Sequence, residues 1–224
     1  MTNPLENECV LAKSLGAVIL IGGRSSRMGR DKSQLLVGGR TFLEEVVRRI
    51  AVAVGPIVVV GNASQDLEKI ANELGTSQPS VAVDFETDQQ SNLGPLEGIR
   101  VGLKHLEPVC SYAFVTSCDV PLVKPELVQF LFDHIENSSA IVPCDKDGNV
   151  FGMTAIYKTN LHTEIGQMIE RNELRVSNLA ERFGAKRILV DELRAIDPKL
   201  DSLMNVNRVD DYDDLLRKIA DDNR

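Results

Sequence analysis

The sequence predicts an α/β fold with three layers, in which helices cover both faces of a mostly parallel sheet. Short apolar runs rich in branched residues, such as 17–21 and 57–60, have the length and composition of strands that are buried on both faces. Stretches with helical spacing of apolar residues alternate with these runs along the chain. Because such sheets bind ligands at the carboxyl ends of their strands, the polar residues that follow each run are the candidates for a functional site.

The expected elements follow one another in a regular order, and several have clear start signals. Thr41 stands at an N-cap position with Glu44 three residues later, which is the arrangement of a capping box. Pro125 suits the first turn of another helix, because its fixed φ and missing N–H are tolerated there. We expect strands at 16–21, 57–60, 81–83, 112–116, 140–143, 154–157 and 185–190, and helices at 41–50, 64–74, 99–105, 125–136, 160–171, 174–182 and 209–221.

Length and composition predict one ordinary globular domain. The chain has 224 residues, of which 43% are hydrophobic and 26% charged, enough for one sizeable core. We expect a flexible N-terminal tail at 1–14 and a single domain over 15–224. The net charge of −8 argues against a broad nucleic-acid-binding surface, and no apolar run approaches the length of a membrane span.

The cysteines and the N-terminus favour a cytoplasmic protein. The four cysteines lie far apart without a C-x-x-C pair, so neither a zinc site nor a disulfide framework is expected. The N-terminal residues lack the charged-then-apolar layout of a secretory signal. We therefore expect reduced thiols and a cytoplasmic location.

The segment 22–32, GGRSSRMGRDK, follows the first expected strand and is rich in glycine and cationic residues. Glycines allow close approach of the backbone, main-chain N–H groups bind oxygens, and Arg and Lys supply charge, so the segment suits phosphate binding. Its spacing matches neither the P-loop nor the dinucleotide-binding pattern. From these residues alone, a flexible basic loop after a core strand remains the alternative.

Two further polar residues follow expected strands. Asp119 comes shortly after the strand at 112–116 and could hold a Mg²⁺ ion, which prefers one or two carboxylates together with phosphate oxygens and water. The alternative is a loop aspartate that caps the helix starting near Pro125. Asn62 follows the second strand, where it could contact a nucleotide or, with Gly61, simply form a turn.

The segment 22–32 resembles G-G-x-S-x-R-M-G-x-D-K, the first motif of nucleotidyltransferases that activate a small phosphorylated molecule with an NTP. Within that group the sequence most resembles the molybdenum cofactor guanylyltransferases. Asp88 and the segment 94–98 resemble the family pattern D-x5-G-P-L-x-G, although Glu97 stands where the family often has Ala. The segment 118–121 resembles the metal-binding C-D-x-P motif, and the N-x-N segment 205–207 matches in part. Eight positions of the first motif match, namely Gly22, Gly23, Ser25, Arg27, Met28, Gly29, Asp31 and Lys32.

This resemblance implies a Rossmann-like nucleotidyltransferase fold and a reaction that transfers GMP from GTP to molybdenum-molybdopterin with release of pyrophosphate. It implies a Mg²⁺ cofactor on Asp119 and GTP and molybdenum-molybdopterin as partners, with molybdoenzyme-maturation proteins as further partners and neither nucleic acid nor membrane. By the same resemblance the catalytic residues are Arg27, Lys32 and Asp119, and the nucleotide-binding residues are Ile21, Gly22, Gly23, Lys32, Asn62, Asp88 and Asp119.

Two alternatives to this function stay open. A cytidylyltransferase or a sugar-phosphate nucleotidyltransferase could share the same fold, since residue logic alone does not fix the base. A non-catalytic nucleotide-binding regulator could also keep it, although the intact Arg27, Lys32 and Asp119 argue against a regulator.

Overall fold

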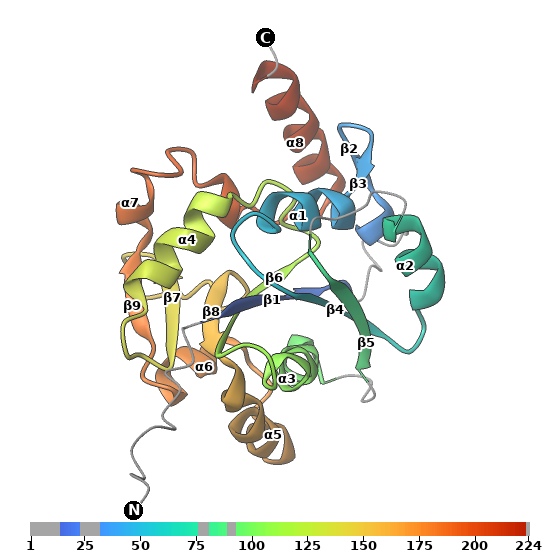
Figure 1. Ribbon diagram of the computed structural model, residues 1–224. Helices are drawn as coiled ribbons and strands as arrows, with labels where there is room; N and C mark the ends of the chain where they lie inside the picture. The colour runs from blue at the N-terminus through green and yellow to red at the C-terminus, as the bar shows by residue number, and fades with distance from the viewer. Residues whose placement is uncertain (1–13, 23–31, 76–80, 89–92, 223–224) are drawn as a thin grey trace, which may run out of the picture.

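A seven-stranded sheet with the strand order β5-β4-β1-β6-β8-β7-β9 forms the middle layer of the protein (Figure 1). The computed structural model describes residues 14–22, 32–75, 81–88 and 93–222. A small hairpin of two strands lies apart from the main sheet. The strands are β1 (Leu15–Leu20), β2 (Leu36–Val37), β3 (Arg40–Thr41), β4 (Ile57–Asn62), β5 (Val83–Asp88), β6 (Tyr112–Ser117), β7 (Ala140–Cys144), β8 (Ala155–Lys158) and β9 (Lys186–Leu189).

The sheet is mostly parallel, as the sequence predicts. β1 pairs in parallel with β4 on one side and β6 on the other, and β5 continues the parallel part beyond β4. β8 runs antiparallel to both of its neighbours, and β9 is parallel to β7. The carboxyl ends of β5, β4, β1 and β6 therefore lie at one edge of the sheet.

Helices cover both faces of the sheet, which gives three layers (Figure 1). One core joins the sheet to α1, α2 and α4, and a second joins it to α3, α5 and α6. Helix α8 projects from the body of the molecule beside the β2–β3 hairpin. The helices are α1 (Phe42–Ile50), α2 (Leu67–Gly75), α3 (Pro95–Leu106), α4 (Pro125–His134), α5 (His162–Glu170), α6 (Ser177–Arg182), α7 (Val190–Leu193) and α8 (Val209–Asp222).

Local signals in the sequence place several elements correctly. The Thr41 hydroxyl accepts a hydrogen bond from the backbone N of Glu44 at 3.2 Å, and the Thr41 backbone N donates to Oε2 of Glu44 at 2.6 Å, which completes the predicted capping box of α1. Pro125 begins α4 as expected. Ser14 belongs to the ordered fold rather than to the predicted tail, because its carbonyl accepts from Tyr112 N at 3.1 Å, whereas 1–13 lie outside the described residues.

Three predicted boundaries are wrong for physical reasons. The strand expected at 81–83 runs instead through the polar residues 83–88, because pairing with β4 stabilises an edge strand that composition alone does not suggest. Helix α3 begins four residues before the expected 99, with Pro95 in its first turn. Helix α2 begins at Leu67 rather than Ser64, because Oδ1 of Asn62 accepts from the Ser64 backbone in a turn.

Two glycines of α3 let the helix pack closely against β1. A Cβ atom on Gly98 would lie 3.0 Å from Cδ2 of Leu20, and a Cβ atom on Gly102 would lie 2.4 Å from Cγ1 of Val18. Real Cβ atoms do not approach a neighbour at the second distance, so the helix can keep this position only with glycine at 102. The close contact sets the distance between α3 and the middle of the sheet.

A Gly102→Ala substitution is therefore expected to destabilise the protein by about 1–3 kcal/mol, because the added methyl group overpacks the contact with Val18. The measurement is the free energy of unfolding in urea. Gly166→Ala in α5 is the matched control, since its Cβ atom would meet Arg100 Cδ at an ordinary 3.6 Å. The control should be neutral or slightly stabilising, because alanine favours the helix. Equal effects of the two variants would contradict this account of α3.

In the part of the chain that the structure describes, none of the helices combines the length and the apolar character needed to cross a bilayer.

Candidate active site

The carboxyl edge of the parallel strands brings together most of the described residues that the sequence singles out. Asn62 at the end of β4 lies directly opposite Asp88 at the end of β5. On the other side, Leu20 at the end of β1 lies opposite Ser117 at the end of β6. Gly22 follows β1 between these two pairs, so the candidate nucleotide-binding residues line one continuous edge.

Asp119 lies at this edge, two residues beyond β6. Its side chain is partly buried, and the hydroxyl of Ser117 donates a hydrogen bond to its Oδ1. The alternative role of capping α4 is wrong, because the N-cap of α4 is Lys124 and no side chain supplies that cap. Asp119 therefore belongs to the candidate site rather than to the N-terminus of the helix.

The donor set at Asp119 fits a hard divalent cation. It offers a carboxylate with a neighbouring hydroxyl, and oxygen donors of this kind suit Mg²⁺ or Mn²⁺. Within the described residues, no group of three or more His, Cys, Asp or Glu side chains is arranged to hold a metal. A cation at Asp119 would thus take most of its remaining ligands from phosphate oxygens and water, as Mg²⁺ usually does in nucleotide sites.

Asn62 combines both roles that the sequence leaves open. Its side-chain Oδ1 accepts from the backbone N of Ser64 at 2.9 Å and from the Ser64 hydroxyl at 2.6 Å, so the predicted turn exists. Its side-chain Nδ2 lies on the side of Gly22, where a Cβ atom would be 3.6 Å away. Because the turn occupies the oxygen, the amide N–H groups are the atoms that can face a ligand beside the β1 loop.

Asp88 lies near another carboxylate, that of Glu97. Burial raises the pKa of Asp88 above its ordinary value, and the charge of Glu97 raises it further. Glu97 is only 1% exposed, and Arg100 binds both of its carboxylate oxygens at 2.7 Å. Glu97 is thus buried together with its own counter-charge, and its carboxylate acts on Asp88.

The two glycines of the segment 94–98 have different surroundings. Gly94 has a φ of +68° as the N-cap of α3, a conformation that favours glycine, and it is exposed. Gly98 is buried against Leu20, so its lack of a side chain serves helix packing rather than approach to a base or ribose. Of the two glycines, only Gly94 remains beside the site.

Several predicted site residues fall where the structure gives no description. Gly23 and Arg27 lie in 23–31, outside the described residues. Lys32 begins a short 3₁₀ helix (Lys32–Gln34), and its side chain also lies outside the described part. Ile21 is buried, its backbone N donates to the carbonyl of Val60 at 3.0 Å, and its own carbonyl accepts from Nε2 of Gln65 at 3.2 Å, so both of its main-chain polar groups have partners within the fold.

The N-x-N segment reaches the site from the other end of the chain. The backbone N of Val206 donates to the carbonyl of Asp119 at 2.8 Å. Asn207 precedes α8, which begins at Val209, and the carboxylate of Asp211 accepts from the backbone N atoms of Asn207 and Arg208 at 2.8 Å. The partial motif could indicate a site residue, but only the fold shows its contact with the Asp119 loop.

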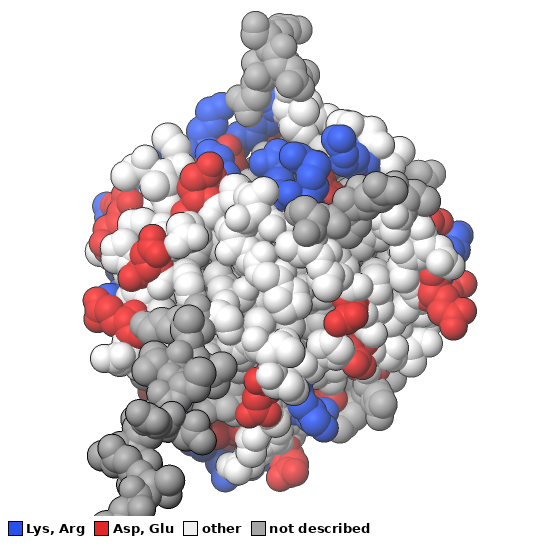
Figure 2. Space-filling model, viewed as in Figure 1, with Lys and Arg blue, Asp and Glu red and all other residues white. Residues whose placement is uncertain are grey.

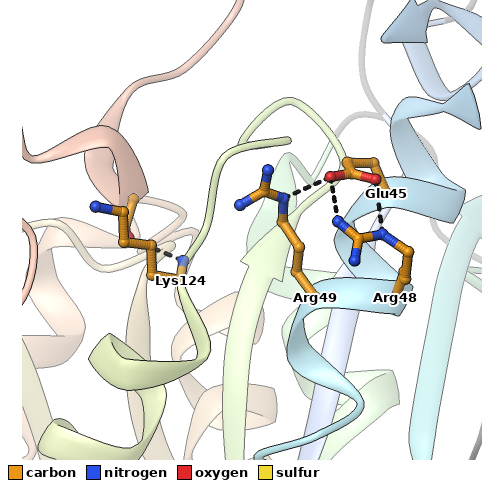
Figure 3. Close-up of polar contacts among 5 residues, drawn as sticks. Glu45, Arg48, Arg49 and Lys124 are labelled. Atoms are coloured by element: carbon orange, nitrogen blue, oxygen red, sulfur yellow. Dashed lines mark hydrogen bonds and ion pairs between the residues drawn. The ribbon is translucent and has the colours of Figure 1, made fainter. Parts of the chain in front are cut away.

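Figure 2 shows basic side chains gathered at the end of the molecule from which α8 projects, whereas acidic side chains are spread around the sides. On α1, Arg48 and Arg49 both bind Oε1 of Glu45, at 2.7 and 2.6 Å (Figure 3). At the start of α4, Nζ of Lys124 lies 2.8 Å from Oδ1 of Asp197. These cations already have carboxylate partners, so they are poor candidates for binding phosphate.

His105 joins α3 to the strand that carries Asp88. Its Nδ1 lies 2.9 Å from Oε1 of Glu86, and its Nε2 lies 3.0 Å from Oδ2 of Asp84. A neutral imidazole has only one N–H, so two carboxylate partners favour the charged ring. Burial opposes that charge, but the hydrogen bonds and charges of Asp84 and Glu86 outweigh burial and raise the pKa of His105 above its ordinary value.

A raised pKa in the folded state means that this contact stabilises the protein at low pH. We expect His105→Gln to lower the free energy of unfolding by about 0.5–1 kcal/mol below pH ~6.5, because the carboxylates are partly exposed and solvent screens them. The difference should disappear as the pH rises through the folded-state pKa of His105. Urea unfolding of both proteins between pH 5.5 and 8.5 measures it, with Lys104→Gln as a control for net charge. A difference that stays constant with pH would contradict the ion-pair assignment.

Comparison with known proteins places the fold among the nucleotidyltransferases. Residues 17–185 match the family described as MobA-like NTP transferase domain. A probable molybdenum cofactor guanylyltransferase of Methanosarcina acetivorans is 32% identical over 213 residues, which cover 93% of this chain and 92% of that protein. A protein of the same description from Mycobacterium marinum is 30% identical and covers 81% and 86%. The chain therefore belongs to the MobA-like NTP transferase family, which confirms the resemblance found in the sequence.

Solved structures agree with the fold. The molybdopterin-guanine dinucleotide biosynthesis protein A of Archaeoglobus fulgidus has a TM-score of 0.75 at 24% identity, over 92% of this chain and 99% of that one. The 4-diphosphocytidyl-2C-methyl-D-erythritol synthase of Anaerococcus prevotii has a TM-score of 0.68 at 16% identity, over 93% and 96%. Rv0371c of Mycobacterium tuberculosis, in complex with manganese, has a TM-score of 0.61 at 17% identity, over 92% and 99%. These likenesses confirm the predicted three-layer fold.

Proposed function

We propose that this protein transfers GMP from GTP to molybdenum-molybdopterin, which releases pyrophosphate and forms the guanine dinucleotide cofactor. The relatives that share about 30% identity over most of the chain are named as probable enzymes of this activity. The observation that carries the proposal is the single edge of the sheet at which Gly22, Asn62, Asp88 and Asp119 meet. Such an edge can hold a nucleotide along its length.

The nucleoside end of GTP would lie toward β4 and β5. There Asn62 presents amide N–H groups beside Gly22, and Asp88 presents a carboxyl that can accept hydrogen bonds from ribose hydroxyls or base N–H groups. Gly22 and Gly23 would let the backbone approach the phosphates, and Arg27 and Lys32 would supply the positive charge. The triphosphate would thus extend from Asp88 past the β1 loop toward Asp119.

A divalent cation would be held by Asp119, and we propose Mg²⁺, which supplies charge neutralisation at the phosphates when bound. A protein with the same fold has been solved in complex with manganese, which is compatible with the use of a divalent cation. The acceptor phosphate forms a new bond to the α-phosphorus of GTP, and the bond to the β-phosphate breaks so that pyrophosphate leaves. The nucleophile is already ionised, so the residues of the chain have to position and neutralise charge rather than to move protons.

We further propose that residues 15–224 act as one domain in the cytoplasm, together with molybdoenzyme-maturation proteins that receive the product. The described cysteines, Cys110, Cys118 and Cys144, are buried thiols without disulfide bonds, which is compatible with a reducing compartment.

Replacing Asp119 tests the proposed cation ligand. Asp119→Asn should lower turnover by at least about 100-fold while the fold is kept, because it removes charge from a position that stabilises the transition state, a loss of about 3 kcal/mol. Pyrophosphate release at saturating Mg²⁺ measures turnover, and circular dichroism verifies the fold. Asp133→Asn is the control, because Asp133 is exposed on α4 and its carboxylate accepts a hydrogen bond from Gln129 on the same helix. Near wild-type turnover of Asp119→Asn would contradict the role.

The base preference tests the proposed nucleotide. With molybdenum-molybdopterin as acceptor, pyrophosphate release with GTP should exceed that with CTP or ATP by at least about tenfold in kcat/KM, a difference of roughly 1.4 kcal/mol in transition-state stabilisation. Reactions without acceptor give the background for each nucleotide. Equal rates or a preference for CTP would instead support the cytidylyltransferase alternative.

A further inference from the structure

The loop that carries Asp119, residues 118–124, is bound at both ends by one C-terminal segment, residues 197–206. At its start, the carbonyl of Asp119 accepts from Val206 N at 2.8 Å. At its end, the backbone N of Lys124 donates to the hydroxyl of Ser202 at 3.0 Å. The C-terminal segment lies beyond residues 17–185, the part of the chain that matches the family. The Asp119 loop therefore depends on residues that the family match does not include.

Asp197 joins the C-terminal segment to the loop with a buried charge. It is 1% exposed, its Oδ1 lies 2.8 Å from Nζ of Lys124, and its Oδ2 accepts from the backbone N of Ser202 at 2.8 Å. Burial by itself would raise the pKa of Asp197, but the ion pair with Lys124 and the hydrogen bond from Ser202 hold it below its ordinary value. A charged carboxylate that is this deeply buried is stable only while Lys124 and Ser202 remain in contact with it. Asp197 therefore holds the side chain of Lys124 in one position.

Val206 of the C-terminal segment, together with helix α8 that follows it, also contacts the β2–β3 hairpin. Val206 is fully buried among side chains of the β2–β3 hairpin, α1, the Asp119 loop and α8, which are Val37, Phe42, Leu122 and Leu215. The hydroxyl of Tyr212 in α8 donates to the carbonyl of Leu36 at 2.6 Å, and Lys218 of α8 forms an ion pair with Asp201. The hairpin begins four residues after Lys32, so the C-terminal segment connects the Asp119 loop with the end of the glycine-rich motif.

We infer that Asp197 and Lys124 are positioning residues for Asp119, and that their ion pair sets the affinity of the site for its divalent cation. The inference rests on the proposed role of Asp119. Lys124 N and Asp119 O are anchored to the same short segment, so a shift of Lys124 moves the segment and, through Val206, the backbone of Asp119. Residues that hold a metal-binding side chain in place affect metal affinity or activity by about 10–100-fold when they are replaced.

A purely stabilising ion pair would behave differently. Glu45 is a suitable comparison, because it is also a largely buried carboxylate on the same face of the sheet, and its partners Arg48 and Arg49 belong to its own helix (Figure 3). No hydrogen bond or ion pair drawn in Figure 3 joins this group to Lys124. Glu45→Gln thus removes a buried charge without releasing the Asp119 loop.

The test uses Asp197→Asn, Lys124→Met, the double variant, Lys124→Arg and the control Glu45→Gln in the full chain. Three readouts are compared: the Mg²⁺ concentration for half-maximal pyrophosphate release, binding of Mn²⁺ measured by electron paramagnetic resonance, and hydrogen exchange of the Val206 amide measured by NMR. We expect Asp197→Asn and Lys124→Met to weaken Mg²⁺ and Mn²⁺ about 10-fold and to speed exchange at Val206. The double variant should be no worse than either single variant, and Lys124→Arg should restore most of the affinity.

The outcomes separate the alternatives. Unchanged cation affinity and unchanged exchange at Val206 in Asp197→Asn would overturn the inference, as would an equal loss of affinity in Glu45→Gln. If Asp197→Asn does not fold, Lys124→Met still tests the pair, because Lys124 is partly exposed. Absence of turnover in the wild-type protein with every nucleotide would contradict the proposed function, while Mn²⁺ binding and exchange at Val206 would still decide on the positioning role.

Discussion

The parallel pairing of β1 with β4 and β6 is the constraint on which the rest of the structure depends. Ala17, Val18 and Ile19 have no exposed surface, and alternate residues of β1 belong to the cores on opposite faces of the sheet. Burial of this kind fixes the register, because a slip of one residue would exchange the two faces. Since the strands run in the same direction, a fixed register also fixes which residues meet at the carboxyl edge. Asn62 and Asp88 become neighbours there, although 25 intervening residues separate them in sequence.

The sequence predicts best those features that depend on local signals. The apolar run of β1, the capping box at Thr41 and the start of α4 at Pro125 are all correct, because each follows from a few adjacent residues. The strand state of 83–88 could not be predicted, since it comes from pairing with β4 rather than from its own acidic composition. The motifs place Asp88 and Asp119 as site candidates, and the structure adds their neighbours. The roles of Arg27 and Lys32 stay predictions, because those side chains lie outside the described residues.

The main contact that sequence reasoning missed joins two residues that are distant in the chain, and one of them is a buried charge. Asp197 gives no local signal, since an aspartate before a proline is typical of a turn. Its burial and its pairing with Lys124, more than 70 residues earlier, follow from the packing of the whole C-terminal segment. Glu97 is a different case, because its partner Arg100 lies only three residues further along α3, but the structure is needed to show that this pair is buried beside Asp88. Buried charges of this kind contribute little net stability, but they hold one geometry, since any displacement leaves a charge without its partner.

The balance of positive and negative charge at the carboxyl edge of the sheet is a further constraint on the site. An acidic protein with Asp88 and Asp119 at one edge has to attract a polyanionic nucleotide there, so cations must outweigh these carboxylates locally. Several described basic residues near the Asp119 loop, α1 and α3 pair with carboxylates, as in Arg48–Glu45, Arg100–Glu97, Lys124–Asp197 and Lys218–Asp201. In the proposed function, the cationic residues of the segment 22–32 and a divalent cation at Asp119 would supply the remaining positive charge. In this proposal, the Arg and Lys side chains that pair with carboxylates keep the site in position, and they do not bind the nucleotide. The Asp119 carboxylate can then act only if a cation and a phosphate bind next to it at the same time.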